Sequence, residues 1–408
     1  MAAPKLRFKE FDQKWGVDAL QDQIDFLAGY AFDSKLMSNE PQKYQLIKMS
    51  NVYQNQLDLT RNPSYWTNID SKIEKFLLKK GDIVLTLTGT VGKTDYGYNV
   101  EIDKDDKFLL NQRLVRLRAK QDLSDSKFIQ YRISTDKFFY HFFYSSKGGT
   151  GNQSNVSIED LKLLELNFPS KEEQTKIASF LSAVDEKISQ LTQKHQLLSQ
   201  YKQGMMQKLF SQQLRFKADD GSEFGEWEET LLSEFLTESL IKGLKGNEAK
   251  KLTVKLWGKG VVSKNEAFEG SENTQYYKRF VGQLIYGKLD FLNCAFGIIP
   301  AHLDGYETTI DAPSFDINKE KANPYFLLNR FLQKDFYKKN GEEADGSRKA
   351  KRINQSVFLA MQIDLPCLEE QTKIANFLSA IDQKIEVVAQ QIEQAKTWKK
   401  GLLQQMFV

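Results

Sequence analysis

The chain has 408 residues, which is long enough for two or three domains with separate hydrophobic cores. Its hydrophobic content is 40%, no apolar run approaches the ~18 residues of a membrane-spanning helix, and the N-terminus lacks an apolar signal region. We therefore expect a cytoplasmic protein without membrane contact, and the mildly basic net charge of +3 permits nucleic-acid binding without establishing it.

The first part of the chain, residues 1–170, is predicted to form a mixed α/β domain. It opens with the motif Leu6-Arg7-Phe8, which is followed by Trp15. Residues 125–140 form an aromatic-rich amphipathic pattern that predicts a helix. Short apolar runs that are typical of strands occur at residues 45–49, 82–87, 114–118 and 161–168.

Residues 171–213 are predicted to form one long helix. Pro169 precedes it and acidic residues occupy its first turn, as suits a helix N-terminus. Apolar residues recur about every 3.5 positions over more than four heptads, which indicates a coiled-coil seam. The seam positions of this helix are Ile177, Leu181, Val184, Ile188, Leu191 and Leu198.

A second mixed α/β domain is predicted over residues 214–366. It opens with Leu214-Arg215-Phe216 followed by Trp227, which repeats the opening of the chain. Residues 323–336 predict an amphipathic helix. Strand-like runs occur at residues 283–286, 296–299 and 357–365.

The last segment, residues 367–408, repeats the first long helix. Glu369–Phe407 aligns with Glu172–Phe210 without a gap, and about half of the positions are identical. A repeat of this length indicates one structural unit that is used twice. The seam positions of the second helix are Ile374, Leu378, Ile381, Ile385, Val388 and Ile392.

The repeat predicts an α+β protein with a pseudo-two-fold axis. Two equivalent domain–helix units pack best about such an axis when their helices run in opposite directions, so we expect an antiparallel coiled coil. Lys202 and Lys399 occupy the same seam position in the two copies. Their stems could lie along the seam with the ammonium groups in water, or the lysines could fix the register as polar seam residues do.

Polar and basic loops in both domains are candidates for DNA contact. Arg and Lys read guanine edges and bind phosphate, Asn and Gln read adenine edges, and Gly permits close approach of the backbone. Surface turns of ordinary domains use the same residue types. The candidates are Thr90, Lys93, Lys147, Gln153 and Asn155 in the first domain, and Lys288, Arg348, Lys351, Arg352 and Asn354 in the second.

The sequence predicts no catalytic or metal centre. Gly92-Lys93-Thr94 resembles the end of a P-loop, but Leu87 stands where the first glycine is required. The three histidines are scattered, and no Cys/His spacing resembles a zinc site. Cys294 and Cys367 both lie in apolar stretches, so we expect buried free thiols in a reducing compartment.

Taken together, these motifs resemble the specificity subunit of a type I restriction–modification system, over nearly the full chain. The resemblance is carried by Leu6-Arg7-Phe8 with Trp15, by the Glu-Glu-Gln-x-x-Ile-Ala helix start after Pro169 and Pro366, and by the Phe-Leu-Ser-Ala-x-Asp heptads. In that family the variable regions are target recognition domains, and each reads one half of a bipartite asymmetric DNA site.

The resemblance implies four segments. Residues 1–170 and 214–366 would be the two target recognition domains, and residues 171–213 and 367–408 would be spacer helices that set the distance between half-sites and bind two modification subunits. Those partners would use S-adenosylmethionine to methylate adenine, and restriction subunits would use ATP and Mg²⁺ for translocation and cleavage. The chain itself would bind double-stranded DNA, hold no cofactor and catalyse no reaction.

Two other classes of protein fit parts of the pattern. A stand-alone sequence-specific DNA-binding protein would use the same basic loops, but it has no need of long helices that present surface to a large partner. A scaffold built on the coiled coil would have no affinity for DNA. Tight DNA binding without partners would favour the first class, and absence of DNA binding would favour the second.

Overall fold

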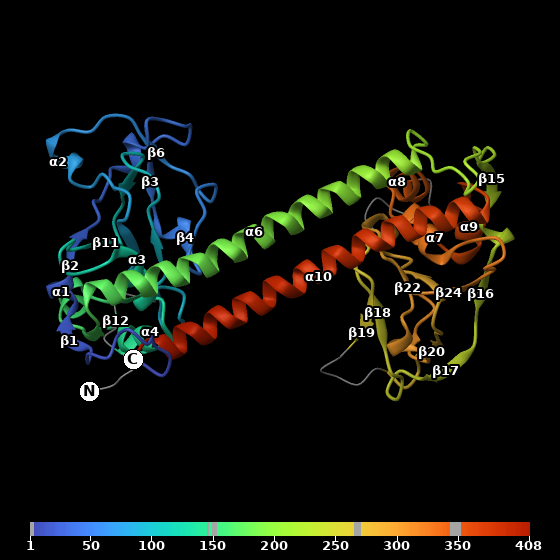
Figure 1. Ribbon diagram of the computed structural model, residues 1–408. Coiled ribbons are helices and arrows are strands. Elements are labelled where there is room, and N and C mark those ends of the chain that lie inside the picture. The colour runs from blue at the N-terminus through green and yellow to red at the C-terminus, as the bar shows by residue number, and fades with distance from the viewer. Residues whose placement is uncertain (1–3, 145–146, 149–152, 265–270, 343–351) are drawn as a thin grey trace. The chain divides into compact units, whose positions relative to one another are not determined.

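The computed structural model describes residues 4–144, 147–148, 153–264, 271–342 and 352–408, which belong to two compact units (Figure 1). The first unit contains the chain up to Thr192 together with Gln390–Val408, and the second contains Gln193–Ala389. Each unit combines small, mostly antiparallel sheets with short helices and with part of both long helices, which confirms the predicted fold class. In the described ranges no helix is both long and apolar enough to cross a membrane.

The centre of the first unit is a four-stranded antiparallel sheet that is buried on both faces. Ile83 and Leu85 belong to one hydrophobic cluster and Val84 to another, because successive side chains of a strand point to opposite faces. The sheet order is β2 (Ile24–Ala28), β11 (Leu114–Ala119), β7 (Ile83–Thr86) and β9 (Asn99–Glu101). Helices α3 (Ser126–Arg132) and α4 (Asp136–Tyr144) cover one face, and strands β3 (Tyr44–Ile47), β6 (Tyr65–Trp66) and β10 (Phe108–Leu110) cover the other.

Shorter elements complete the first unit. Strand β1 (Gly16–Ala19) pairs with β14 (Glu165–Phe168), and β4 (Val52–Tyr53) pairs with β5 (Gln56–Leu57). A separate three-stranded sheet has the order β12 (Lys147–Gly148), β13 (Gln153–Asn155) and β8 (Thr88–Thr90). The short helices are α1 (Leu20–Gln23), α2 (Ser71–Glu74) and α5 (Ile158–Lys162).

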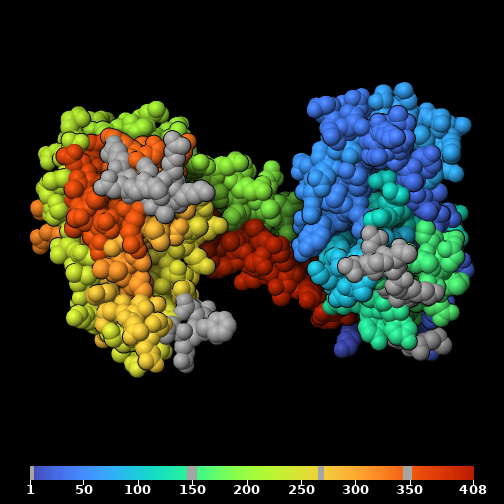
Figure 2. All heavy atoms as spheres, turned by 180° about the vertical axis from the view of Figure 1, so that it is seen from behind, coloured from blue at the N-terminus to red at the C-terminus, as the bar shows by residue number. Residues whose placement is uncertain are grey.

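The second unit repeats this plan with different details. Its four-stranded sheet has the order β16 (Leu236–Ser239), β24 (Ser314–Ile317), β21 (Leu284–Tyr286) and β22 (Phe296–Ile298), and β15 (Glu228–Leu231) pairs with β25 (Gln362–Leu365). Smaller sheets join β17 (Lys242–Lys245), β20 (Gln275–Lys278) and β23 (Glu307–Thr308), and β18 (Leu252–Val254) with β19 (Val261–Ser263). The helices are α7 (Pro324–Phe331), α8 (Lys334–Glu342) and α9 (Gln355–Leu359). Viewed from behind, part of the orange segment between β24 and β25 lies at the surface of this unit (Figure 2).

Several predicted elements differ from the observed ones. The helix expected over residues 125–140 is two helices, α3 and α4, because the Thr135 hydroxyl donates to the carbonyl of Arg132 and accepts from the amide of Phe138, which ends one helix and caps the next. The helix expected over 323–336 is likewise split into α7 and α8. The strands expected at 161–168 and 357–365 begin as the short helices α5 and α9 and become strands only at Glu165 and Gln362.

The two long helices are α6 (Lys171–Phe210) and α10 (Leu368–Met406), each roughly 60 Å long at 1.5 Å per residue. In each unit they lie side by side and run in opposite directions, so the antiparallel coiled coil is confirmed (Figure 1). The predicted seam positions are turned inward. Ile177, Leu181, Val184, Leu191, Ile374, Leu378, Ile381, Val388 and Ile392 are buried, and Ile188, Leu198 and Ile385 are half-buried.

The opening motif of each domain holds the start of the long helix in its own unit. In the first unit, Nε and Nη2 of Arg7 donate to the two carboxylate oxygens of Glu173 at 2.7 Å each, and the indole of Trp15 donates to the same carboxylate at 3.3 Å. The second unit repeats the arrangement with Arg215, Trp227 and Glu370 as its members. The duplicated sequence motif therefore makes the same contact with the start of a long helix in both units.

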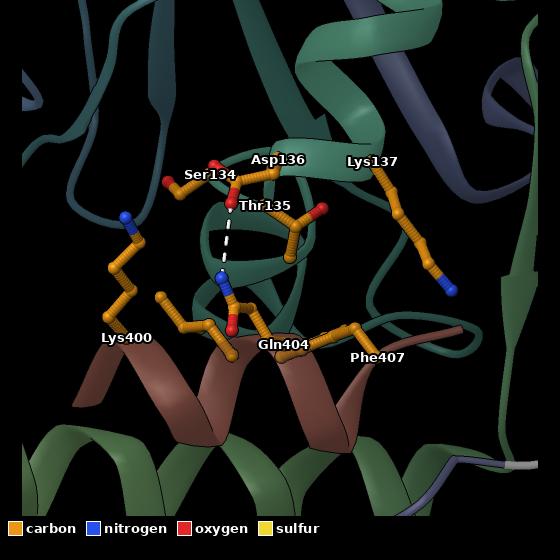
Figure 3. A pocket seen from close by; sticks show the side chains of 8 residues that line it. Ser134, Thr135, Asp136, Lys137, Lys400, Gln404 and Phe407 are labelled. Carbon is orange, nitrogen blue, oxygen red and sulfur yellow. Dashed lines mark hydrogen bonds between the residues drawn. The ribbon is translucent and has the colours of Figure 1, made fainter. Parts of the chain in front are cut away.

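The last turns of each long helix complete a domain core. In the first unit, the ring of Phe407 lies 6.4 Å from that of Trp15 and 5.3 Å from that of Phe128, measured between centroids. Beside this contact, Gln404 points toward Asp136 at the start of α4, with Nε2 3.4 Å from Oδ2, on the wall of a cavity of about 310 Å³ (Figure 3). In the second unit, Leu209 and Phe210 at the end of α6 pack into the core around α7.

The two cysteines differ in environment. Cys294 is buried, as expected, and burial raises the pKa of its thiol to about 11. Cys367 is exposed, so the expectation that both thiols are buried is wrong for this residue. Cys367 lies between β25 and α10, where the chain passes from the sheet to the long helix.

Candidate nucleic-acid interface

In the first unit, the small three-stranded sheet brings most of the candidate residues together. Strand pairing places Gln153 opposite Thr90 and Lys147 opposite Asn155. The side chains of Lys147 and Gln153 lie outside the described part of the structure. Lys93 follows the sheet in a turn, where its amide donates to the carbonyl of Thr90 at 3.0 Å.

A carboxylate beside this sheet restricts what Thr90 can do. The Thr90 hydroxyl donates to Oδ2 of Asp95 at 2.7 Å, and the Thr90 amide donates to Oδ1 at 2.8 Å. These hydrogen bonds hold the pKa of Asp95 below its ordinary value, so the carboxylate is charged at neutral pH. Because the hydroxyl proton is engaged, Thr90 presents acceptor lone pairs rather than a donor. Gly89 is required here, since a Cβ at this position would lie 2.2 Å from Tyr96.

Asn155 ends strand β13 with an exposed side chain. Its Oδ1 accepts a hydrogen bond from the hydroxyl of Thr88 at 3.1 Å, so the amide group is oriented by a neighbouring strand. A side-chain amide has two donors and an oxygen with two lone pairs, and contact with Thr88 uses one of those lone pairs.

In the second unit, Arg352 is the exposed candidate with a defined partner. Its side chain is 47% exposed and forms an ion pair with Asp311 through Nη2. Asn354 is exposed at the N-cap of α9. Arg348 and Lys351 lie outside the described residues.

Lys288 lies in a different environment from the other candidates. Only 5% of the residue is exposed, and burial lowers the pKa of its ammonium group. Together with Asp311 and Tyr276 it lines a cavity of about 200 Å³. This burial leaves little of Lys288 for contact with a DNA phosphate.

The candidate segments of the two units are equivalent in the fold. The amide of Val156 donates to the carbonyl of Leu87 at 3.0 Å, and the amide of Ile353 donates to the carbonyl of Lys288 at 3.2 Å. The next residue in each case is the N-cap of a short helix, α5 or α9, which leads through one strand into a long helix. The residue before Val156 is Asn155, and the residue before Ile353 is Arg352, so Asn155 and Arg352 occupy equivalent positions.

Sequence reasoning missed the partners of these side chains. Asp95 is only five residues from Thr90 and could have been suspected from that spacing. Thr88 is distant in sequence from Asn155, and Asp311 is distant from Arg352, so no local pattern indicates either contact.

A second candidate surface lies on the long helices. Tyr201 and Trp398 occupy equivalent positions of the repeat and are 51% and 54% exposed. In the first unit, Trp398 borders a groove of about 400 Å³ along the helix pair, together with Leu191 and Ala395. In the second unit, Leu197 lies one turn from Tyr201 and is 57% exposed. A contiguous exposed apolar patch is typical of protein-binding surfaces.

Comparison with known proteins gives consistent matches. A family model for the type I restriction modification DNA specificity domain matches residues 12–200 and 313–397. The putative type I restriction enzyme MjaX specificity subunit of Methanocaldococcus jannaschii is 25% identical over 411 residues, covering 98% of this chain and 94% of the relative. The type I restriction enzyme MjaVIII specificity subunit of the same organism is 27% identical over 347 residues, covering 81% and 79%.

Solved structures share the fold. The S subunit of a type I restriction-modification system from M. genitalium superposes with a TM-score of 0.61 at 18% identity, covering 100% of this chain and 99% of that one. A chain from a structure of complex assembly and conformational transition of the type I R-M system gives a TM-score of 0.56 at 14% identity, covering 97% and 98%. At these identities the likeness is one of fold.

Proposed function

Because the chain belongs to the type I restriction–modification DNA specificity family and is a specificity subunit of such a system, we propose that each of its units reads one half of a bipartite asymmetric DNA site. One observation carries this proposal. The same framework of a buried glutamate that binds an arginine and a tryptophan recurs in both units, whereas the exposed residues at equivalent positions differ, as Asn155 and Arg352 do. A duplicated frame with different surface chemistry suits the reading of two different sequences.

The helix pair then acts as a spacer. Bases between the two half-sites would go unread, and the length of α6 and α10 would set how many there are. Half-sites about one DNA turn apart, roughly 34 Å, suit a reader with two-fold symmetry. The proposal gives the coiled coil a function beyond that of joining two domains.

The exposed aromatic positions on the helices would dock two copies of a modification subunit. Tyr201 and Trp398 are equivalent in the repeat, which supports one type of partner bound twice rather than two different partners. Those subunits would supply S-adenosylmethionine and methylate adenine. Restriction subunits with ATP and Mg²⁺ would complete the assembly, and this chain would contribute recognition without catalysis.

The test is base-modification sequencing of genomic DNA from the host with and without this gene. We expect an interrupted two-part motif with methyladenine on both strands that disappears on deletion. Co-purification with a methyltransferase should accompany it. A chain that binds one specific DNA site tightly by itself, with no change of methylation on deletion, would contradict the proposal.

A further inference from the structure

We infer that Asn155 and Arg352 are one base-reading position repeated in the two units, where Asn155 reads adenine and Arg352 reads guanine. The inference rests on the proposed function and adds to it the chemical identity of one base in each half-site. It also assigns Thr88 and Asp311 as positioning residues that orient these two side chains.

The equivalence of the two positions comes from the backbone. In each unit the residue after the reading position donates its amide to a carbonyl just beyond a central strand, β7 in one case and β21 in the other. In each unit the short helix that follows has its N-cap two residues after the reading position. The two side chains therefore project from equivalent positions of the same backbone arrangement in the two units.

The first unit presents an oriented amide. Asn pairs with adenine in the major groove when its oxygen accepts from N6 and its nitrogen donates to N7. The hydroxyl of Thr88 donates to Oδ1 of Asn155 at 3.1 Å and leaves the second lone pair of that oxygen for the base. The contact thus fixes which edge of the amide carries the acceptor.

The second unit presents an oriented guanidinium. Arg pairs with guanine when two N–H groups donate to O6 and N7. The ion pair with Asp311 engages Nη2, and the guanidinium has five N–H donors in a fixed plane, so donors remain for the base. An ion pair whose two side chains are 47% and 46% exposed contributes little to stability, which favours a role in orientation.

Neighbouring candidates fit this role less well. The hydroxyl proton of Thr90 is donated to Asp95, and Lys288 is 5% exposed. Among the described candidates, Asn155 and Arg352 form a pair of exposed side chains at equivalent positions, so both can reach into a groove. The two residue types at this position also differ in the base that each prefers, as an asymmetric site requires.

The inference is tested by base-modification sequencing of a host with the complete system and this chain as wild type or variant. The wild-type motif should contain a guanine in the half-site read by the second unit. Arg352→Asn should change or relax that one base, with modification of guanine-containing sites reduced roughly tenfold or more, while the other half-site stays the same. Asp311→Asn should relax the same base less strongly.

Two further variants guard against misinterpretation. Asn155→Arg should add a guanine preference in the first half-site, a gain that misfolding cannot produce. Lys319→Asn removes an exposed charge elsewhere in the second unit and should leave the motif unchanged.

The outcomes separate the inference from the proposed function. A wild-type motif that persists unchanged in Arg352→Asn and Asn155→Arg would overturn the inference and leave the function standing. Uniform loss at all sites in Arg352→Asn with full recovery in Arg352→Lys would also overturn it, because it would indicate a phosphate contact. A wild-type system that yields no two-part motif would overturn the function and the inference together.

Discussion

A buried carboxylate at the start of each long helix accepts three hydrogen bonds from the opening motif of its domain. Glu173 has a side-chain exposure of 2% and Glu370 of 0%, and each receives two N–H groups from one arginine and one from an indole. Such bidentate, charge-assisted hydrogen bonds are stronger than neutral ones. The pKa of Arg7 and of Arg215 is raised, first because each donates to its glutamate, so both arginines stay charged.

Replacement of Glu173 by Gln should destabilise the first unit by about 3 kcal/mol, because the change leaves a half-buried guanidinium without its counter-charge. Urea unfolding followed by circular dichroism would measure the loss. Glu172→Gln is the matched control, since Glu172 is adjacent and exposed, and it should cause a much smaller change. Equal effects of the two substitutions would show that the buried pair contributes no more than surface charge.

The residue-scale features divide into those that the sequence contains and those that only folding creates. The repeat of Arg and Trp at the start of each domain could be read directly from the chain, but not their convergence on Glu173 and Glu370. The ion pair between Arg352 and Asp311 joins residues with no shared local pattern. The sequence also does not predict the burial of Lys288, because lysine residues ordinarily lie on the surface.

At the scale of elements, two polar contacts fix the pairing of the long helices. In the first unit, Nζ of Lys399 lies 2.5 Å from Oδ1 of Asp185, and the same carboxylate accepts from the hydroxyl of Tyr131 in α3 at 2.7 Å. In the second unit, Lys202 lies 2.7 Å from Asp382, which also accepts from a tyrosine of α7. The lysine and the aspartate are 17 residues apart on both helices, so both contacts belong to one register.

This arrangement decides between the two roles considered for the seam lysines. A slide of one heptad would place Lys202 opposite Ala375 or Ala389 and would leave its charge without a partner. The contacts therefore disfavour alternative registers, as polar seam residues do in other coiled coils. The stems still lie along the seam, with side-chain exposures of 20% for Lys202 and 26% for Lys399.

Asp185→Ala should therefore cost about 2 kcal/mol, since it leaves a buried tyrosine hydroxyl and a seam ammonium without their acceptor. Tyr131→Phe removes the hydrogen bond to Asp185 and the longer one, at 3.3 Å, with the hydroxyl of Ser182, and should cost about 1 kcal/mol. Glu186→Ala, on the exposed side of the same helix, is the control and should be nearly neutral. Urea unfolding of the three variants gives the ranking, and a neutral Asp185→Ala would rule out the register role.

Periodicity predicted the long helices well and the short elements less well. The seam pattern repeats over more than four heptads, so a few exceptions do not obscure it, and the predicted positions are buried or half-buried. The segment 125–140 is amphipathic on both sides of Thr135, so its pattern continues across the break at which the Thr135 hydroxyl caps the second helix. The candidate DNA-contacting residues follow no periodic sequence pattern, and their arrangement in space depends on strand pairing.

At the scale of the whole molecule, the equivalent aromatic positions predict the stoichiometry of the complex. Trp398→Lys and Tyr201→Lys should each remove one modification subunit, and the double variant should remove both, because a charge on a desolvated contact disfavours docking. Native mass spectrometry of the co-expressed complex would count the subunits. Trp257→Lys changes a tryptophan that is 57% exposed outside the long helices and should retain two. Retention of two subunits by the double variant would place the docking surface elsewhere.

The spacer role predicts a change of gap length without a change of sequence preference. Four residues added within Thr192–Leu198, with four more at the equivalent place in α10, would lengthen each helix by roughly 6 Å. At about 3.4 Å per base pair the unread gap should grow by about two base pairs, while both half-sites keep their bases. Base-modification sequencing would show both quantities in one experiment. Four residues added to the exposed segment 219–223 lie outside the helices and should leave the gap unchanged. The same gap in both insertion variants would mean that something other than helix length sets the spacing.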